Sequence, residues 1–190
     1  MNSLVIDMTH GGVKIAVSLA KKDETVYAYD IYNTLKSVDK KMLAVYNVKI
    51  IDLDYLKNLN GNLRVIYPVH LPLTKRDIEK YNPSLNYTFL THHEIIKELL
   101  KNWGNDIPKI EVTGVKGKTS CVFMLKEILI DKNPLILSSL GALLYENGVK
   151  KTLKQNISIT PANIKETIDL AYKNNNGEII EIKTIKELYI

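Results

Sequence analysis

A strand, a glycine loop and the start of a helix follow one another in Ile110-Glu111-Val112-Thr113-Gly114-Val115-Lys116-Gly117-Lys118-Thr119-Ser120. The pattern G-x-x-G-K-T within this stretch is typical of loops that bind phosphate groups. It lacks the first glycine of the full P-loop pattern, because Val112 stands at that position. The stretch therefore predicts a variant phosphate-binding loop. The simpler alternative is an ordinary glycine turn followed by a helix.

Each part of this loop has a physical role in the predicted site. Gly114 and Gly117 let the backbone turn tightly, so that successive N–H groups can point inward at phosphate oxygens. The helix that follows adds the positive end of its dipole. Lys118 is placed to reach the terminal phosphates, and the hydroxyl of Thr119 is placed to bind Mg²⁺. A nucleotide with magnesium is the expected ligand.

The composition excludes several classes of protein. The formal net charge of +5 comes from 26 basic and 21 acidic residues among 190, and the only arginines are Arg64 and Arg76. Dispersed lysines argue against a nucleic-acid surface and suit an anionic small molecule or a solvated surface. No apolar run approaches the roughly 20 residues of a membrane helix. The single cysteine, Cys121, is expected to be buried and fits a reducing cytoplasm.

Strand and helix patterns alternate along the chain, which predicts an α/β fold with open, mostly parallel sheets. Before the Gly-Pro linker at 104–108, strands are expected at 3–7, 25–30, 47–51, 63–69 and 87–91, with helices at 13–22, 54–59 and 93–103. After it, strands are expected at 109–113, 134–139 and 178–182, a hairpin at 143–156, and helices at 118–130 and from 160 onward. The linker divides the chain into two expected domains, at 1–106 and at 107–190.

The second domain resembles the start of the ATPase domain of the Mur ligase family. Thr113 to Ser120 is similar to its T-G-T-N-G-K-T-T loop, Ser138-Ser139-Leu140-Gly141 to a turn after a strand, Ile159-Thr160-Pro161 to a T-T-P helix start, and Ile180-Glu181-Ile182 to the first part of E-x-S-S. The resemblance implies that residues 1–106 form a Rossmann-like substrate domain. It also implies an ATP-dependent ligase that activates a substrate carboxylate as an acyl phosphate.

The same resemblance implies roles for individual residues. Phosphate binding falls on the loop residues Gly114, Val115, Lys116, Gly117, Lys118, Thr119 and Ser120. Lys118 and Thr160 are implied to act in catalysis, and Thr119 and Glu181 to hold Mg²⁺. The implied cofactors are thus ATP and Mg²⁺.

A narrower resemblance lies in the amino-terminal part. Asp7 to Gly12, Tyr29 to Leu35 and Thr91 to Glu94 are similar to the Mur-ligase-like enzymes of methanogenic archaea that activate a propionate of a nickel tetrapyrrole in coenzyme F-430 biosynthesis. His10, Gly11 and Gly12 follow an expected strand, where backbone N–H groups could hold a substrate carboxylate. The alternative is a glycine-rich turn with His10 as a helix cap.

The chain departs from the family pattern at its end. Lys183 follows Ile182 where the family has serine, and the later ATPase segments and the family's closing domain do not follow. We therefore expect an incomplete ATPase domain and little turnover by this chain alone, with a second chain as a candidate source of the missing half. A non-catalytic nucleotide-binding subunit, a degenerate fragment and a small P-loop kinase stay open as alternatives.

Overall fold

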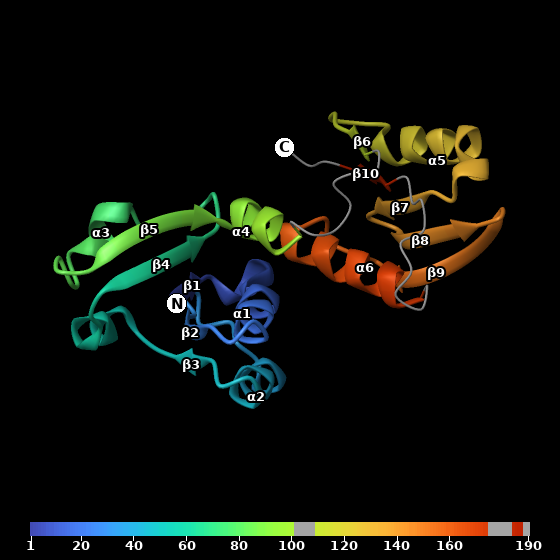
Figure 1. The fold of residues 1–190 in the computed structure, drawn as a ribbon. Coiled ribbons are helices and arrows are strands. Elements are labelled where there is room, and N and C mark those ends of the chain that lie inside the picture. The colour runs from blue at the N-terminus through green and yellow to red at the C-terminus, as the bar shows by residue number, and fades with distance from the viewer. Residues whose placement is uncertain (101–108, 175–183, 188–190) are drawn as a thin grey trace. The chain divides into compact units, whose positions relative to one another are not determined.

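The computed structural model describes residues 1–100, 109–174 and 184–187. The chain folds as two compact units, an amino-terminal unit, Met1–Leu99, and a carboxyl-terminal unit, Leu100–Ile190 (Figure 1). The linker expected at 104–108, and with it the expected boundary between residues 106 and 107, lies outside the described residues.

The amino-terminal unit is built on a five-stranded sheet in the order β3-β2-β1-β4-β5. Its strands are β1 (Asn2–Ile6), β2 (Thr25–Tyr29), β3 (Lys49–Ile50), β4 (Asn62–Tyr67) and β5 (Asn86–Thr91). Every neighbouring pair is parallel. The open parallel sheet predicted from the strand–helix alternation is therefore confirmed.

Helical segments join these strands. They are the π-helical turn η1 (Met8–Gly12), α1 (Val13–Ala20), α2 (Ser37–Val45), the 3₁₀ helix η2 (Leu53–Asn58), α3 (Lys75–Glu79) and α4 (His92–Leu99). The helices expected after the first and third strands are present. The sequence predicted neither α2, which buries only Leu43, nor the single turn α3. Thr74 caps α3 by accepting a hydrogen bond from the N–H of Asp77 at 3.3 Å.

Both faces of this sheet are covered, as expected for parallel strands. One core contains Leu4 and Ile6 of β1 with Leu56 of η2 and Ile78 of α3. Val5 points to the opposite face and is fully buried, as are Ile15 of α1 and Ile95 of α4. The α1 and α4 helices contact each other.

A buried arginine connects the amino ends of two strands with two other segments. Arg64 of β4 lies opposite Ser3 of β1 and donates a hydrogen bond from Nε to its Oγ at 3.2 Å. Its Nη2 lies 2.5 Å from Glu24 Oε2 and its Nη1 lies 3.0 Å from Glu98 Oε1. With only 5% of its side chain exposed, Arg64 is an internal structural ion-pair centre rather than a ligand-binding cation.

The carboxyl-terminal unit contains a mixed five-stranded sheet in the order β6-β10-β7-β8-β9. Its strands are β6 (Lys109–Val112), β7 (Leu135–Ser138), β8 (Gly141–Glu146), β9 (Val149–Gln155) and β10 (Thr184–Glu187). β10 lies between β6 and β7 and runs parallel to both, whereas β7, β8 and β9 are antiparallel. The predicted hairpin is confirmed. The strand expected at 178–182 falls outside the described residues.

Two helices cover opposite faces of this mixed sheet (Figure 1). α5 (Lys118–Ile128) packs with Val122 against Ile136, and α6 (Pro161–Asn174) packs with Ala171 against Leu135 and Leu137. Successive residues of a strand point to opposite sides of its sheet, so Ile136 faces one side and Leu135 and Leu137 the other, and the two helices lie on opposite faces. A short 3₁₀ turn, η3 (Ile130–Lys132), follows α5. No helix in the described ranges has the length and apolarity that crossing a bilayer requires.

Candidate functional site

The loop between β6 and α5 has the geometry expected of a phosphate-binding turn. Gly114 has φ +143° and Gly117 has φ +78°, and Gly117 is the N-cap of α5. A Cβ placed on Gly117 would meet no atom within 4 Å. The glycine is therefore required by the left-handed backbone rather than by crowding, and the space in front of the helix is open.

The reactive side chains of this loop lie at the first turn of α5. Lys118 Nζ donates a hydrogen bond to the carbonyl oxygen of Gly114 at 2.7 Å, which bends the lysine back over the loop. Thr119 and Ser120 follow in the same turn, and Val115 at the tip is 94% exposed. Lys118, Thr119 and Ser120 thus all lie in the first turn of one helix, where its dipole favours an anion.

A second turn lies at the same edge of the mixed sheet. Both β6 and β7 pair in parallel with β10, so their carboxyl ends meet at one edge. After β7, Ser138 Oγ accepts a hydrogen bond from the N–H of Leu140 at 3.2 Å. Gly141 has φ +147°, and a Cβ there would lie 2.5 Å from the carbonyl oxygen of Lys154. The turn predicted at Ser138 to Gly141 is therefore fixed by backbone packing.

Thr160 reaches this edge from a third direction. β9 runs parallel to β7 through two antiparallel pairings and ends beside the same turn, where the N–H of Asn156 donates to Leu140 O at 3.2 Å. Thr160 Oγ1 accepts a hydrogen bond from the N–H of Asn163 at 3.3 Å and so caps α6. The topology therefore brings the start of α6 to the edge that carries the glycine loop, although α5 and α6 cover opposite faces.

The described part of this edge supplies some of the oxygen ligands that Mg²⁺ prefers. The hydroxyls of Thr119 and Ser120 are hard donors next to the predicted phosphate position, and Mg²⁺ commonly combines few protein ligands with phosphate and water. Glu181 lies outside the described residues. Within the described ranges, no group of three or more His, Cys, Asp or Glu side chains could hold a metal ion by itself. The donor set fits a phosphate-bound Mg²⁺ rather than an all-protein cage.

The amino-terminal unit has its own candidate turn, organised by Asp7 at the carboxyl end of β1. The Asp7 side chain is fully buried, and Oδ1 accepts hydrogen bonds from the N–H groups of Thr9 at 2.9 Å and His10 at 3.4 Å. Its backbone has φ 69° and ψ 95°, a strained conformation for a residue with a side chain. This carboxylate thus takes the N–H of His10, one of the backbone groups predicted to hold a substrate carboxylate.

The same carboxylate orients His10. Asp7 Oδ2 lies 2.6 Å from His10 Nδ1, while 63% of the His10 side chain is exposed. The Tyr32 ring stands edge-on to the imidazole, with 6.1 Å between the ring centroids and 87° between the planes. His10 is therefore held by the buried Asp7 rather than acting as the helix cap, a role that belongs to Asp7.

Strand order places this turn where open α/β sheets bind ligands. The chain moves from β1 to β2 on one side, and β4 lies on the other side of β1. The strand order thus reverses at β1, and ligands of such sheets bind outside the carboxyl ends of the strands at that point. Asp7, His10, Gly11 and Gly12 follow directly after β1.

The relatives of the chain agree with the family resemblances of the turn after β1 and of the glycine loop. No family model matches the chain. It is 31% identical over 174 residues to the coenzyme F(430) synthetase of Methanosarcina acetivorans, covering 84% of the chain and 34% of the relative. It is 28% identical over 137 residues to the coenzyme F(430) synthetase of Methanocaldococcus jannaschii, covering 68% and 31%. The chain is homologous to coenzyme F(430) synthetase. It spans about a third of the length of these relatives.

The homology with coenzyme F(430) synthetase runs through both units, because neither unit alone amounts to 84% of the chain. It confirms the resemblance that Asp7 to Gly12 and the glycine loop suggested. Among solved structures, the chain is similar to the UDP-N-acetylmuramate:L-alanyl-gamma-D-glutamyl-meso-diaminopimelate ligase of Neisseria meningitides, with TM-score 0.41, 14% identity and coverage of 97% of this chain and 52% of that one. A murein peptide ligase of Psychrobacter arcticus gives TM-score 0.42, 15% identity and coverage of 98% and 37%.

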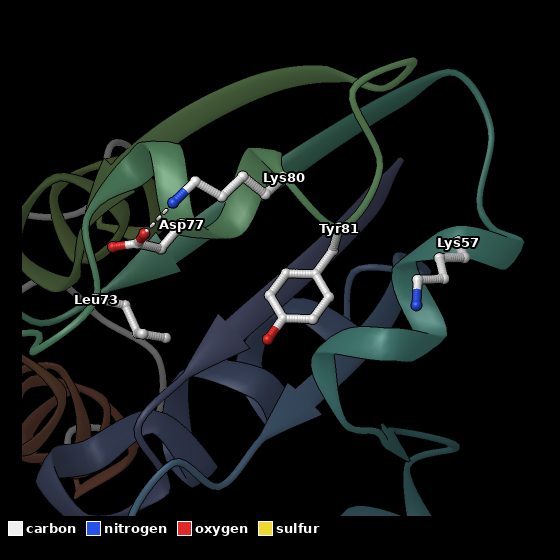
Figure 2. A pocket seen from close by; sticks show the side chains of 5 residues that line it. All are labelled: Lys57, Leu73, Asp77, Lys80 and Tyr81. Carbon is white, nitrogen blue, oxygen red and sulfur yellow. Dashed lines mark hydrogen bonds and ion pairs between the residues drawn. The ribbon is translucent and has the colours of Figure 1, made fainter.

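A cavity of about 480 Å³ lies elsewhere in the amino-terminal unit, lined by Lys57, Leu73, Asp77, Lys80 and Tyr81 (Figure 2). Both of its lysines are paired: Lys80 Nζ lies 2.9 Å from Asp77 Oδ1, and Lys57 Nζ lies 2.5 Å from Asp54 Oδ1. Hydrogen bonds from Thr74 and Lys80 hold the pKa of Asp77 well below its usual range. The charged side chains of this cavity are paired with one another or with Asp54, so we assign it no part in the site.

The sequence did not predict the burial of His92, and it predicted the wrong environment for Cys121. Only 3% of His92 is exposed, and its Nε2 lies 3.2 Å from the carbonyl oxygen of Ile6. It supports the end of β1 immediately before Asp7. Cys121 was expected to be buried, but it is exposed on α5. Helical spacing alone predicts neither the burial of His92 nor the exposure of Cys121, because each depends on which face of its helix meets the sheet.

We expect the burial of His92 to make the fold sensitive to acid. Burial lowers the pKa of His92 below its ordinary value of 6.5, against a smaller opposing effect of the hydrogen bond to Ile6. The unfolded chain binds the proton more tightly than the folded chain, so the contribution is fully present above about pH 6.5 and is lost as the pH falls below it. Urea unfolding between about pH 7 and pH 5 should show a steeper loss of stability for the wild type than for His92→Gln.

The matched control is His93→Gln, since His93 is its exposed neighbour on the same helix. This variant should keep the wild-type slope of unfolding free energy against pH. Equal slopes for the wild type and His92→Gln would contradict the prediction. The charged and titratable groups that act on His92 are Asp7, His10 and His93, so the comparison measures His92 in that setting.

Proposed function

We propose that the chain binds ATP and Mg²⁺ at Gly114 to Ser120 and forms part of an ATP-dependent ligase that activates a substrate carboxylate as an acyl phosphate. The observation that carries this proposal is the loop itself. A strand end, two glycines with positive φ and a helix start occur in the order that phosphate binding requires. The homology to coenzyme F(430) synthetase supports the ligase assignment.

The residues of the loop edge have distinct proposed tasks. Bound ATP with Mg²⁺ would supply the phosphoryl group that activates the carboxylate. Lys118 would leave the carbonyl of Gly114 and neutralise the terminal phosphates, which allows a second anion, the carboxylate, to approach. Thr119 would hold the metal through its hydroxyl, with Glu181 as a proposed second ligand. Thr160, which begins α6 at the same edge, would lie near the reacting groups.

The proposed substrate is a carboxylate of a nickel tetrapyrrole in coenzyme F-430 biosynthesis. Two observations support this proposal: the relatives are coenzyme F(430) synthetases, and the homology to them extends across both units. The amino-terminal unit would bind the substrate at the end of β1, where His10, Gly11 and Gly12 lie. Because the relatives are about three times as long as their matched part, we propose that the complete ligase contains further polypeptide, in the same chain or in a second one.

Calorimetric titration with ATP and Mg²⁺ tests the nucleotide site directly. The wild-type chain should bind ATP, and Lys118→Ala should weaken binding about fiftyfold, because a hydrogen bond from a charged group contributes about 1.5–3 kcal/mol. Lys118 lies at the surface of the loop, so the substitution should leave the unfolding transition unchanged.

Lys150→Ala is the matched control, since Lys150 is exposed on β9 in the same unit, away from the loop edge. It should bind ATP like the wild type. No ATP binding by the wild-type chain, or equal binding by wild type and Lys118→Ala, would overturn the assignment of the loop.

A further inference from the structure

The pair Asp7 and His10 has a geometry that the carboxylate-activation step does not use. We propose that His10 Nε2 is an axial ligand to the nickel of the tetrapyrrole substrate, and that Asp7 is the residue that positions it. The inference rests on the proposed function for the identity of the substrate. It adds how the amino-terminal unit recognises that substrate, through its metal rather than only through its carboxylates.

The hydrogen bonds of the turn fix which nitrogen of His10 faces outward. A carboxylate only accepts hydrogen bonds, so the 2.6 Å contact with Asp7 Oδ2 places the proton of the neutral ring on Nδ1. The lone pair is then on Nε2, at the end of a side chain that is 63% exposed. A histidine whose second nitrogen is bound to a carboxylate is the arrangement that orients imidazole ligands on metals. Imidazole is a suitable ligand for nickel.

The same hydrogen bonds occupy two backbone donors that an anion at this turn could otherwise use. The N–H groups of Thr9 and His10 are already bound to Asp7 Oδ1, so a ligand carboxylate would have to displace a fully buried carboxylate to reach them. Thr9 Oγ1 is also engaged, at 2.5 Å from Thr34 Oγ1. The group that the turn presents outward is thus the imidazole, a neutral donor suited to a metal.

The surroundings of His10 suit a large flat ligand. Tyr32, edge-on to the imidazole, follows β2 and is 43% exposed. Val69 follows β4 and is 61% exposed. Since β2 and β4 flank β1 in a parallel sheet, these apolar side chains and His10 come after strand ends at one edge. A macrocycle seated there could place its metal on His10 and its apolar rim on Tyr32, in the crevice that such sheets offer to ligands.

Coordination of this kind forms one bond, from the Nε2 lone pair to nickel, with no change in the oxidation state of the metal. The experiment adds coenzyme F-430 in its nickel(II) form to the chain without ATP. Binding is measured by titration, and nickel coordination by visible and X-ray absorption spectroscopy. We expect the wild type to add an axial nitrogen to nickel. His10→Ala should lose that signature and bind about tenfold more weakly, the lower end of what disturbing a metal-ligand set costs.

The control is His93→Ala, which removes an exposed histidine of α4 and should behave as the wild type.

Asp7→Asn tests the positioning role. A folded variant should keep binding the macrocycle with a weaker axial-nitrogen signal, because the amide can present an N–H to Nδ1. An axial signature that persists in His10→Ala, or tight binding without any change at nickel, overturns the ligation and leaves the substrate assignment standing. No binding of coenzyme F-430 overturns both, whereas the ATP titration with Lys118→Ala is unaffected.

Discussion

Replacing Gly12 with alanine should lower the free energy of unfolding by about 3 kcal/mol, the upper part of the range for overpacking a tight site. The backbone of Gly12 is helical, with φ −58° and ψ −36°, so local preference alone predicts that alanine stabilises by about 0.5–1 kcal/mol. The added Cβ, however, would lie 2.1 Å from the carbonyl oxygen of Asp7 and 2.9 Å from Met8 Cε. Backbone cannot yield as a flexible side chain can, so the clash decides the sign.

Urea unfolding of the full chain, followed by circular dichroism, measures this effect. Gly61→Ala is the control, because a Cβ there meets nothing within 4 Å although φ is +81°. Gly61→Ala should lower the free energy of unfolding by only about 1–2 kcal/mol, the usual penalty for a residue with a side chain in left-handed backbone. If Gly12→Ala proves as stable as the wild type, the close contact between the π-helical turn and Asp7 is wrong, and with it the orientation of His10.

Replacing Arg64 with alanine should cost about 3–5 kcal/mol, because removing one partner of a buried ion pair leaves the other charge uncompensated. The carboxylate of Glu24 is 16% exposed and would lose its contact at 2.5 Å, and the fully buried Ser3 would lose the donor at 3.2 Å. Glu98 is 54% exposed and can turn to water, so its lost contact should contribute little.

The chain offers a matched control in its only other arginine. Arg76 is exposed on α3, and Arg76→Ala should change the unfolding free energy by less than about 0.5 kcal/mol. Adding Glu24→Gln to Arg64→Ala should restore part of the loss, because the uncompensated charge is then gone. Equal stability of the Arg64→Ala and Arg76→Ala chains would contradict a buried ion-pair centre.

Prediction from the sequence succeeded where an element depends on residues that are close together in the chain. Apolar runs and the glycine-rich turns that interrupt them predicted the parallel sheet of the amino-terminal unit and the β8–β9 hairpin, since both depend on short-range alternation and turn residues. It failed for α2 and α3, which have weak apolar periodicity and are stabilised by their setting. The strand expected at 178–182 lies outside the described residues, and β10, at Thr184–Glu187, was not expected.

The candidate sites likewise contain features that local spacing predicts and features that only tertiary contacts decide. The spacing of Gly114, Gly117 and Lys118 indicates a phosphate loop, because positive φ and a helix start are properties of adjacent residues. The sequence also indicated a ligand-binding turn at His10, Gly11 and Gly12. It gave no sign of Asp7 as the residue that organises the turn, since that role needs a carboxylate buried between strand ends.

By itself, then, the sequence determined the fold class, the glycine loop and the relationship that homology confirmed, all of which are written in the order of neighbouring residues. Tertiary structure alone decided that Arg64 is an internal ion-pair centre, that His92 is buried against Ile6, and that Asp7 turns His10 outward. Each of these depends on burial and on atoms brought together from separate strands and helices. Removal from water changes what a charged or titratable side chain does, and the order of residues does not record it.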